Sequence, residues 1–301
     1  MPEMDKNTPD YIAYVALGVL SFCFGSTFYF NALTLDWFTA LGSGTGRIIV
    51  ACAFLVPISF VSGHGFPNSF RQWVWVSALG ILGMLLPFLM VVWGQRYVPS
   101  NVAAGFFSSI PLLMLMFSRV ILKVPVTRRK WIGLLVGSIG LLTLSGPGTF
   151  SQIGSTGQYL PQLAILLACV LLAGAAIFVR LMPKAPPIQT TSGALFVASI
   201  VSLPIAVSEI PMTAPPMLPL VGLIGAGVIS TGIGNLIRLF LIRRKGPVFI
   251  TPNSYLVTVI AALLGMSFLG ENLTPATLFA FAVIFAGLLI AHDGTGSMRR
   301  S

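Results

Sequence analysis

Ten mostly apolar runs of about twenty residues follow one another along the chain, separated by short polar segments. An α-helix needs about twenty residues to cross the roughly 30 Å hydrocarbon layer at about 1.5 Å per residue, so each run can span once. The pattern therefore predicts an all-α polytopic membrane protein with ten transmembrane helices. The runs centre on residues 11–31, 41–62, 73–95, 102–121, 131–145, 160–182, 190–207, 218–242, 249–269 and 273–292.

Composition supports the same class. Hydrophobic residues make up 56% of the chain and charged residues 8%, and the mean hydropathy is +0.94. So few polar groups do not cover the surface of a soluble globule, and we expect the lipid bilayer to surround the protein, as the inner membrane of a bacterium. The pI near 10.1 does not indicate nucleic-acid binding here, because the basic residues lie in short loops that orient the helices.

The distribution of Lys and Arg predicts how the helices are oriented. With the N-terminus in the cytoplasm, the external loops hold little that is basic beyond Arg96, and both termini are cytoplasmic. We expect no cleavable export signal, because the first run is too long and lacks a basic leader. The cytoplasmic segments then hold Lys6, Arg71, Arg119, Lys123, Arg128, Arg129, Lys130, Arg180, Lys184, Arg243, Arg244, Lys245, Arg299 and Arg300.

The chain repeats itself at an offset of 147 residues. Five helices in each half is an odd number, so the second half enters the membrane from the opposite side and the halves form an inverted repeat around a site near the midplane. We predict a first repeat over 11–147, an external linker over 148–157, a second repeat over 158–292, and cytoplasmic tails over 1–10 and 293–301. The offset superimposes Gly46 on Gly193, Pro57 on Pro204, Gly80 on Gly227, Arg96 on Arg243 and Gly140 on Gly287.

Several short motifs resemble the EamA-type members of the drug/metabolite transporter superfamily. They are the turn 269–274, read Leu-Gly-Glu-Asn-Leu-Thr, the Gly-rich stretch 286–289, Gly25 with Ser26 and Phe28, and Arg47. The first half departs from the turn, with Val124 at the acidic position. The resemblance covers almost the whole chain and implies a ten-helix transporter in which helices one, three, four, six, eight and nine surround a cavity. It also implies that Arg47 is kept for gating or packing.

Two charged residues lie well inside the apolar runs, Arg47 and Arg238, and no Asp or Glu lies deep within any run. In the eighth run Thr231, Asn235 and Arg238 share one helix face and form the leading substrate-site candidate. A guanidinium offers paired donors to a carboxylate or phosphate, and the amide both donates and accepts. The alternative is that Arg238 extends to the cytoplasmic headgroups.

Other polar and aromatic residues form a wider set of substrate-binding candidates. The alternatives are that the hydroxyls bond to helix carbonyls and that the aromatic rings belong to the interfacial belt. Pro87 is expected to be a hinge, Gly25 to serve gating or packing, and Glu271 to cap a helix. The wider set comprises Ser21, Tyr29, Trp93, Gln95, Asn101, Ser108, Ser109, Thr251, Ser254, Tyr255 and Thr258.

Small residues in the fifth and tenth runs suit close helix contact. Gly133 and Gly137 form a Gly-x-x-x-Gly pair, and Ala282 and Ala286 form a second small-residue pair. The contact is either internal or the interface of a homodimer. The three cysteines, Cys23, Cys52 and Cys169, are expected to be packing residues, and we expect no metal site and no cofactor.

The charge of the expected cavity indicates the class of substrate. Without a carboxylate in the membrane, the cavity is neutral to positive, which favours anionic, zwitterionic or neutral metabolites over lipophilic cations. We predict a secondary transporter, not an enzyme, that exports amino acids or related small molecules by alternating access. The alternatives left open are a multidrug exporter of lipophilic compounds and a pore or scaffold without alternating access.

Overall fold

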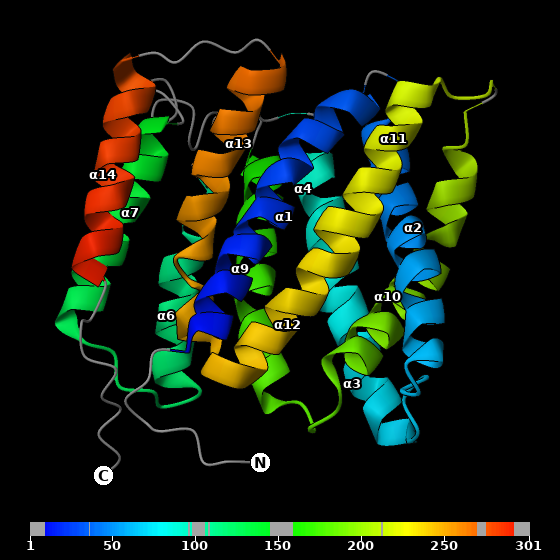
Figure 1. Ribbon diagram of the computed structural model, residues 1–301, viewed down its shortest axis with the longest axis horizontal. Coiled ribbons are helices and arrows are strands. Elements are labelled where there is room, and N and C mark those ends of the chain that lie inside the picture. Colours follow the sequence, from blue (N-terminus) through cyan, green and yellow to red (C-terminus); the bar gives the residue numbers. More distant parts are fainter. Residues whose placement is uncertain are drawn as a thin grey trace.

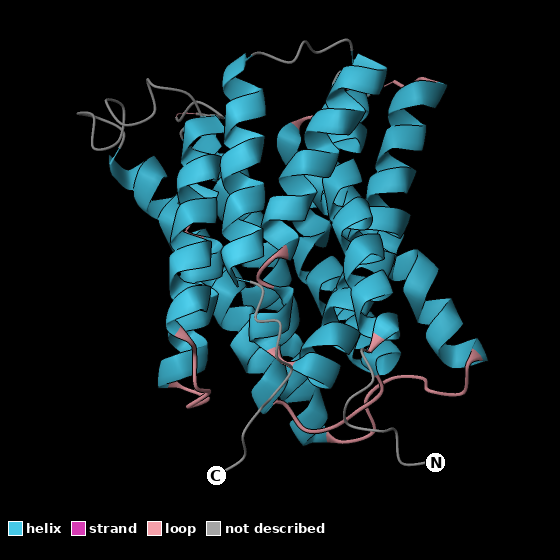
Figure 2. Ribbon diagram, turned by 60° about the vertical axis from the view of Figure 1, so that its left-hand side comes forward, coloured by secondary structure: helices cyan, strands magenta, loops and turns pink. Residues whose placement is uncertain are grey.

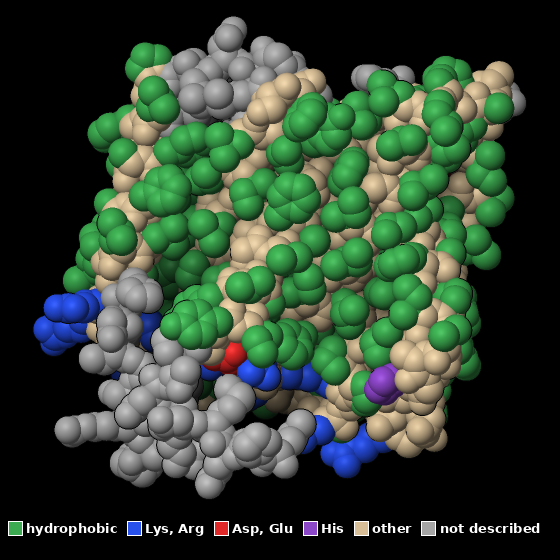
Figure 3. All heavy atoms as spheres, in the orientation of Figure 1, with side chains coloured by type: hydrophobic (Ala, Val, Ile, Leu, Met, Phe, Trp, Pro, Cys, Tyr) green, Lys and Arg blue, Asp and Glu red, His purple; other side chains and the backbone are tan. Residues whose placement is uncertain are grey.

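The computed structural model is a bundle of long helices that run side by side along one axis (Figures 1 and 2). It describes residues 10–35, 37–95, 97, 106–107, 109–144, 159–211, 213–269 and 275–291. Every regular element within these residues is helical, so the predicted all-α class is confirmed. The flanks of the bundle are largely apolar (Figure 3), as a surface that contacts lipid requires.

The helices keep close to the predicted runs, although some apolar runs are divided between elements. Seven helices are long and apolar enough to cross a membrane, compared with the ten predicted, and Ile110–Val120 and Leu278–Ala291 are shorter apolar helices. The elements are α1 (Tyr11–Leu35), α2 (Ala40–Val61), α3 (Phe70–Gly80), η1 (Ile81–Leu85), α4 (Leu86–Gln95), α6 (Ile110–Val120), α7 (Arg128–Leu144), α9 (Tyr159–Leu181), α10 (Pro187–Ser208), α11 (Met217–Gly225), η2 (Ala226–Ile233), α12 (Gly234–Lys245), η3 (Pro247–Ile250), α13 (Asn253–Leu269) and α14 (Pro275–Ala291).

Two of the long helices are interrupted by π-helical segments, η1 between α3 and α4 and η2 between α11 and α12. Pro87 follows η1 and has no N–H to donate to the carbonyl four residues before it, which disfavours a regular α-turn there. The helical turn is wider there instead, and the Leu86 N–H donates to the Ile81 carbonyl five residues back. In η2 the Thr231 hydroxyl donates to the Ala226 carbonyl at 3.0 Å, also five residues back.

The two halves use matching elements. An offset of 147 residues carries both ends of α2 onto those of α10, and both ends of α7 onto those of α14. The same offset places η1 within η2. Helix pairing is reciprocal as well, because α1 packs along α11–η2–α12 while α9 packs along α3–η1–α4, and α2 packs on α10. The repeat in the sequence is therefore accompanied by a repeat in helix boundaries and neighbours.

The helices α7 and α14 lie together at one edge of the bundle (Figure 1). A Cβ placed on Gly133 would lie 2.5 Å from the Gly287 carbonyl oxygen, and one placed on Gly287 would lie 2.5 Å from the Gly137 nitrogen. The Gly-x-x-x-Gly face is therefore used for an internal contact, which decides between the two alternatives for these glycines. A homodimer through the fifth and tenth predicted helices, which correspond to α7 and α14, stays a prediction.

Basic side chains gather at one end of the bundle, which we call the basic end (Figure 3). In Figure 1 it is the lower end, where α3, α7 and α10 begin and α6, α9 and α12 end. Asp10 precedes α1 there and accepts hydrogen bonds from Arg244 at 2.7 and 3.1 Å, with Lys245 Nζ at 3.1 Å. These bonds to Arg244 and Lys245 hold the pKa of Asp10 below its usual value. The contact ties the start of α1 to the end of α12.

Candidate functional site

Arg47 lies inside the bundle and joins three elements. Its side chain in α2 is largely buried, and Nε donates to Thr231 Oγ1 in η2 at 2.8 Å. The guanidinium carbon is 5.6 Å from the centroid of the Phe88 ring in α4. Sequence reasoning named Arg47 and Thr231 separately, and their hydrogen bond, which connects the two halves of the chain, was not predicted.

Asn235 and Arg238 continue the polar stripe from Thr231 towards the basic end. Asn235 Nδ2 donates to the Thr231 carbonyl at 2.8 Å, and Arg238 Nη2 donates to the Leu172 carbonyl of α9 at 3.1 Å. Leu172 lies nine residues before the end of α9, roughly 13 Å along the axis from the basic end. Arg238 therefore points into the bundle, which contradicts the alternative that it extends to the headgroups.

The stripe lines a small pocket between α3, η1, α9 and α12. Asn235 and Arg238 provide its polar wall, and the remaining lining residues are Leu79, Gly83, Met84, Ala175, Val179, Leu239 and Ile242. The space admits about one water molecule, so a metabolite enters only if these helices separate. In this conformation the pocket is too small to hold a metabolite beside its polar groups.

No acidic residue offsets the two arginines within the described helices. Asp10 and Glu209 flank helices, and the remaining Asp and Glu residues of the chain lie outside all apolar runs. Among the described residues Arg47 and Arg238 donate to a hydroxyl and to a carbonyl, both uncharged. A buried cation is costly without a paired anion, so an anionic ligand would complete this site electrostatically.

The family follows from comparison with known proteins, because the model of the EamA-like transporter family matches residues 11–146 and again residues 160–292. The chain belongs to the EamA-like transporter family. The resemblance to the drug/metabolite transporter superfamily is thereby confirmed, and the protein is a membrane transporter, not an enzyme. A solved structure described as "Crystal structure of protein" matches with a TM-score of 0.79 and 16% identity over 93% of this chain and 97% of that chain, which supports the fold alone.

Three named proteins are similar to this chain over most of their length. The uncharacterized inner membrane transporter YedA of Escherichia coli K12 is 27% identical, over 91% of this chain and 89% of the relative. A probable terminal-alkyne amino-acid exporter of Streptantibioticus cattleyicolor is 22% identical over 88% of both chains. The S-adenosylmethionine uptake transporter of Rickettsia felis is 27% identical over 84% and 83%. The match to an inner membrane protein agrees with the predicted multi-pass location.

In this EamA-like transporter, Tyr255 is not at the pocket. Its ring is fully buried against Gly137 of α7, and its hydroxyl donates to the Leu134 carbonyl at 2.8 Å and lies 3.4 Å from Ser138 Oγ. These contacts tie α13 to α7. The polar stripe alone did not reveal this packing contact, and a role of Tyr255 in substrate binding stays a prediction.

Other predicted site residues make local or interhelical bonds. Ser21 Oγ donates to the Leu17 carbonyl at 2.8 Å and to Asn253 Oδ1 at 3.0 Å, linking α1 to α13 through a residue that sequence reasoning missed. Thr251 Oγ1 donates to the Val248 carbonyl at 2.8 Å, and Ser109 Oγ to the Phe106 carbonyl at 2.7 Å. The alternative of hydroxyls bonded to nearby carbonyls thus describes both of these residues.

The remaining candidates lie near packing or lipid-facing surfaces. Tyr29 packs on Phe268 with centroids 5.3 Å apart, and Trp93 is 40% exposed beside Tyr97. A Cβ on Gly25 would lie 2.7 Å from Ile260, so this glycine allows α1 and α13 to approach. Ser254 is half-buried in α13. Asn101, Ser108, Glu271 and the side chains of Gln95 and Thr258 lie outside the described residues.

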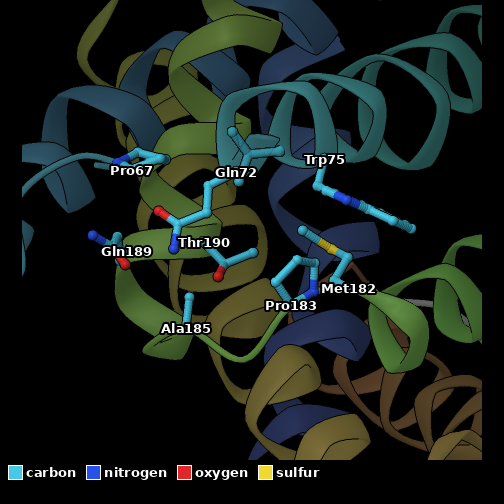
Figure 4. Close-up of a pocket in the computed structure, with 9 residues that line it drawn as sticks. Pro67, Gln72, Trp75, Met182, Pro183, Ala185, Gln189 and Thr190 are labelled. Atoms are coloured by element: carbon cyan, nitrogen blue, oxygen red, sulfur yellow. The ribbon is translucent and has the colours of Figure 1, made fainter. Parts of the chain in front are cut away.

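A second small pocket lies at the basic end, between α3 and the start of α10 (Figure 4). Gln189 Nε2 donates to the carbonyls of His64 and Phe66 at 3.1 and 2.9 Å, and Thr190 Oγ1 accepts from Arg243 Nη2 at 3.1 Å. Sequence reasoning did not name Gln189 or Thr190, although polar residues follow Pro187 at the start of the helix. Their bonds hold α10 to the α2–α3 loop and to α12.

Proposed function

We propose that this EamA-like transporter is a secondary transporter that exports amino acids or related small carboxylate-bearing metabolites, with Arg238 and Asn235 as their anchors. The observation that carries the proposal is that Arg238 lines a small pocket between helices and donates to a neutral carbonyl, with no acidic partner among the described residues. A substrate carboxylate accepts two parallel bonds from a guanidinium, and Asn235 offers an amide beside it. The name of the S. cattleyicolor relative supports amino-acid export, whereas the R. felis name describes uptake.

The proposed mechanism is alternating access between two inverted five-helix halves that together span the membrane ten times. The matching helix boundaries and the reciprocal pairing of α1 and α9 support this arrangement. The collection of Lys and Arg at the basic end supports cytoplasmic termini. In whole cells, a membrane-impermeant maleimide should label a cysteine replacing Thr39, at the opposite end of α2, and should not label one replacing His64. Labelling of both from outside would reject the orientation.

Counterflow tests the transport mode. The purified full-length protein is reconstituted into liposomes and assayed with a panel of radiolabelled amino acids and small organic acids. An alternating carrier moves at least one labelled compound faster when the liposomes are loaded with the same unlabelled compound, because the loaded carrier reorients in both directions. Flux without this acceleration would identify a pore, and retention of every compound would reject the proposed substrate class. Loading the liposomes and following efflux under an imposed gradient then tests export.

Arg238→Gln tests the anchor. Loss of charge-assisted hydrogen bonds to a carboxylate costs about 1.5–3 kcal/mol, so flux of an acid substrate should fall about tenfold to a hundredfold. The midpoint of thermal unfolding in detergent should move little, because the bond to the Leu172 carbonyl is replaceable by the Gln amide. Arg119→Gln, on an exposed arginine at the basic end, is the matched control and should leave flux unchanged. Unchanged flux in Arg238→Gln would remove this residue from the site.

A further inference from the structure

Arg47 is a buried cation with unused hydrogen-bonding capacity. Arg47 is 8% exposed and lies within α2. A guanidinium carries five N–H donors, and among the described residues its one hydrogen-bond acceptor is Thr231 Oγ1, reached by Nε. The four N–H groups on Nη1 and Nη2 are left for another acceptor. A hydrogen bond that only holds two helices together needs one neutral donor, not a guanidinium with five N–H groups.

The position of Arg47 relative to the Arg238 pocket is set by two helices. Thr231, its partner, lies four residues from Asn235 on the pocket wall, and Phe88, its aromatic neighbour, lies four residues from Met84 on the facing wall. Each step is about one helical turn. The two helices that form opposite walls of the pocket therefore both contact the Arg47 guanidinium, about one turn further from the basic end.

Phe88 lies beside Arg47, four residues from Met84 of the pocket wall. A Cβ on Gly44 would overlap the Phe88 ring, so the absence of a side chain on Gly44 is what lets the ring lie against α2 beside Arg47. Phe88 follows Pro87 and the π-helical segment η1, where the backbone departs from α-helical bonding. A change of the η1 backbone therefore moves this ring directly, and with it the contact between the ring and Arg47.

We propose that Arg47 is a second anion-binding residue on the transport path, which receives the carboxylate or phosphate of a small organic anion one turn beyond the Arg238 pocket. The proposal rests on the proposed function, in which Arg238 is the first anion-binding residue. In the empty carrier the Thr231 hydroxyl is the neutral acceptor for Arg47. In the loaded carrier the anion takes Nη1 and Nη2 as a planar, paired acceptor, and Phe88 moves aside to admit it.

Charge-selective labelling beside Arg47 tests this without knowledge of the substrate. Phe88→Cys is introduced into a chain whose native cysteines, Cys23, Cys52 and Cys169, are replaced by Ala, and the protein is reconstituted into liposomes. The probes are two methanethiosulfonates of similar size, one carrying an anionic ethylsulfonate and the other a cationic ethyltrimethylammonium. Position 88 should react at least tenfold faster with the anionic probe. The preference should fall to near unity in Arg47→Gln and persist in Arg47→Lys, which retains the charge.

Three outcomes would overturn the proposal. They are no reaction at position 88 with either probe, an equal preference in Arg47 and Arg47→Gln chains, and a loss of preference in Thr231→Val as large as in Arg47→Gln. The third outcome would mean that Arg47 acts only through its hydrogen bond to Thr231. Each variant is first required to elute as a single symmetric peak in detergent, and Arg47→Lys supplies the charged comparison if Arg47→Gln does not fold.

Arg238→Gln in the same cysteine background separates the two proposals. If Arg47 acts in its own right, the anionic preference at position 88 persists in Arg238→Gln whether or not flux is lost. Normal flux in Arg238→Gln together with a preference that depends on Arg47 would reject the Arg238 pocket and keep the Arg47 site. Loss of flux in Arg238→Gln with no charge preference at position 88 would keep the Arg238 pocket and reject the Arg47 site.

Discussion

The pair α7–α14 and the pair of interrupted helices, α3–η1–α4 and α11–η2–α12, both contain closely packed glycines but differ in the regularity of their backbone bonding. In α7–α14, Gly133 and Gly287 face backbone atoms of the other helix, Gly137 faces the Tyr255 ring, and both helices are regular throughout their described length. In the interrupted helices, glycine and Pro87 accompany π-helical bonding and adjoin the buried polar groups Arg47, Thr231 and Arg238. Neither glycine content nor what a Cβ would meet separates the fixed contact of α7–α14 from the deformable interrupted helices, because a Cβ on Gly80 of α3 would overlap the Ala194 carbonyl oxygen. The difference lies in the regularity of the backbone bonding.

Adding one methyl group to the fixed contact should have the largest effect on stability. In Gly133→Ala the new Cβ meets the Gly287 carbonyl oxygen, at 2.5 Å, and backbone atoms of α14 do not move aside as a flexible side chain does. Overpacking of this kind costs about 1–3 kcal/mol, occasionally more. We expect a marked fall in the midpoint of thermal unfolding in detergent and a lower yield of monodisperse protein.

Gly174→Ala is the matched control, because nothing lies within 4 Å of a Cβ at that position in α9. Replacing a helical glycine by alanine at an open site is neutral or stabilises by about 0.4–1 kcal/mol. The difference between the two variants measures the contact itself. Equal midpoints for Gly133→Ala and Gly174→Ala would show that α7 and α14 are not held in backbone contact.

Removing the proline from an interrupted helix should change transport more than stability. Pro87→Ala supplies an N–H that bonds within the helix and favours a regular α-turn over the π-helical bonding of η1. We expect flux in liposomes to fall several-fold while the unfolding midpoint is unchanged or raised. Pro57→Ala in α2 is the control, since Pro57 also lies inside a helix but is not next to a π-helical segment. A parallel fall in flux for both variants would assign no special role to η1.

Much of the fold was predictable because helix length and apolar composition are read directly from the sequence. The all-α membrane class, the offset of 147 residues and the close contact at Gly133 and Gly137 all come from such local patterns. The side that a helix presents to each neighbour cannot be read from such local patterns. Arg47 lies within an apolar run, but its bond to Thr231 joins residues 184 positions apart, which no local pattern reveals. The π-helical segments were missed as well, because apart from Pro87 and the glycines they carry no compositional signal.

Tyr255→Phe has the smallest expected effect and tests where the boundary between the two regions lies. The Tyr255 hydroxyl ties α13, which packs along α1, to α7 at the edge of the bundle. Its removal leaves the Leu134 carbonyl with its own helical bond, so we expect a loss of about 0.5–1.5 kcal/mol in stability and unchanged flux. Tyr11→Phe, on a side chain that is 67% exposed, is the control and should change neither. If Tyr255→Phe instead loses flux at an unchanged unfolding midpoint, its hydroxyl serves the substrate, and the deformable region of the transporter extends through α13 to the face of α7.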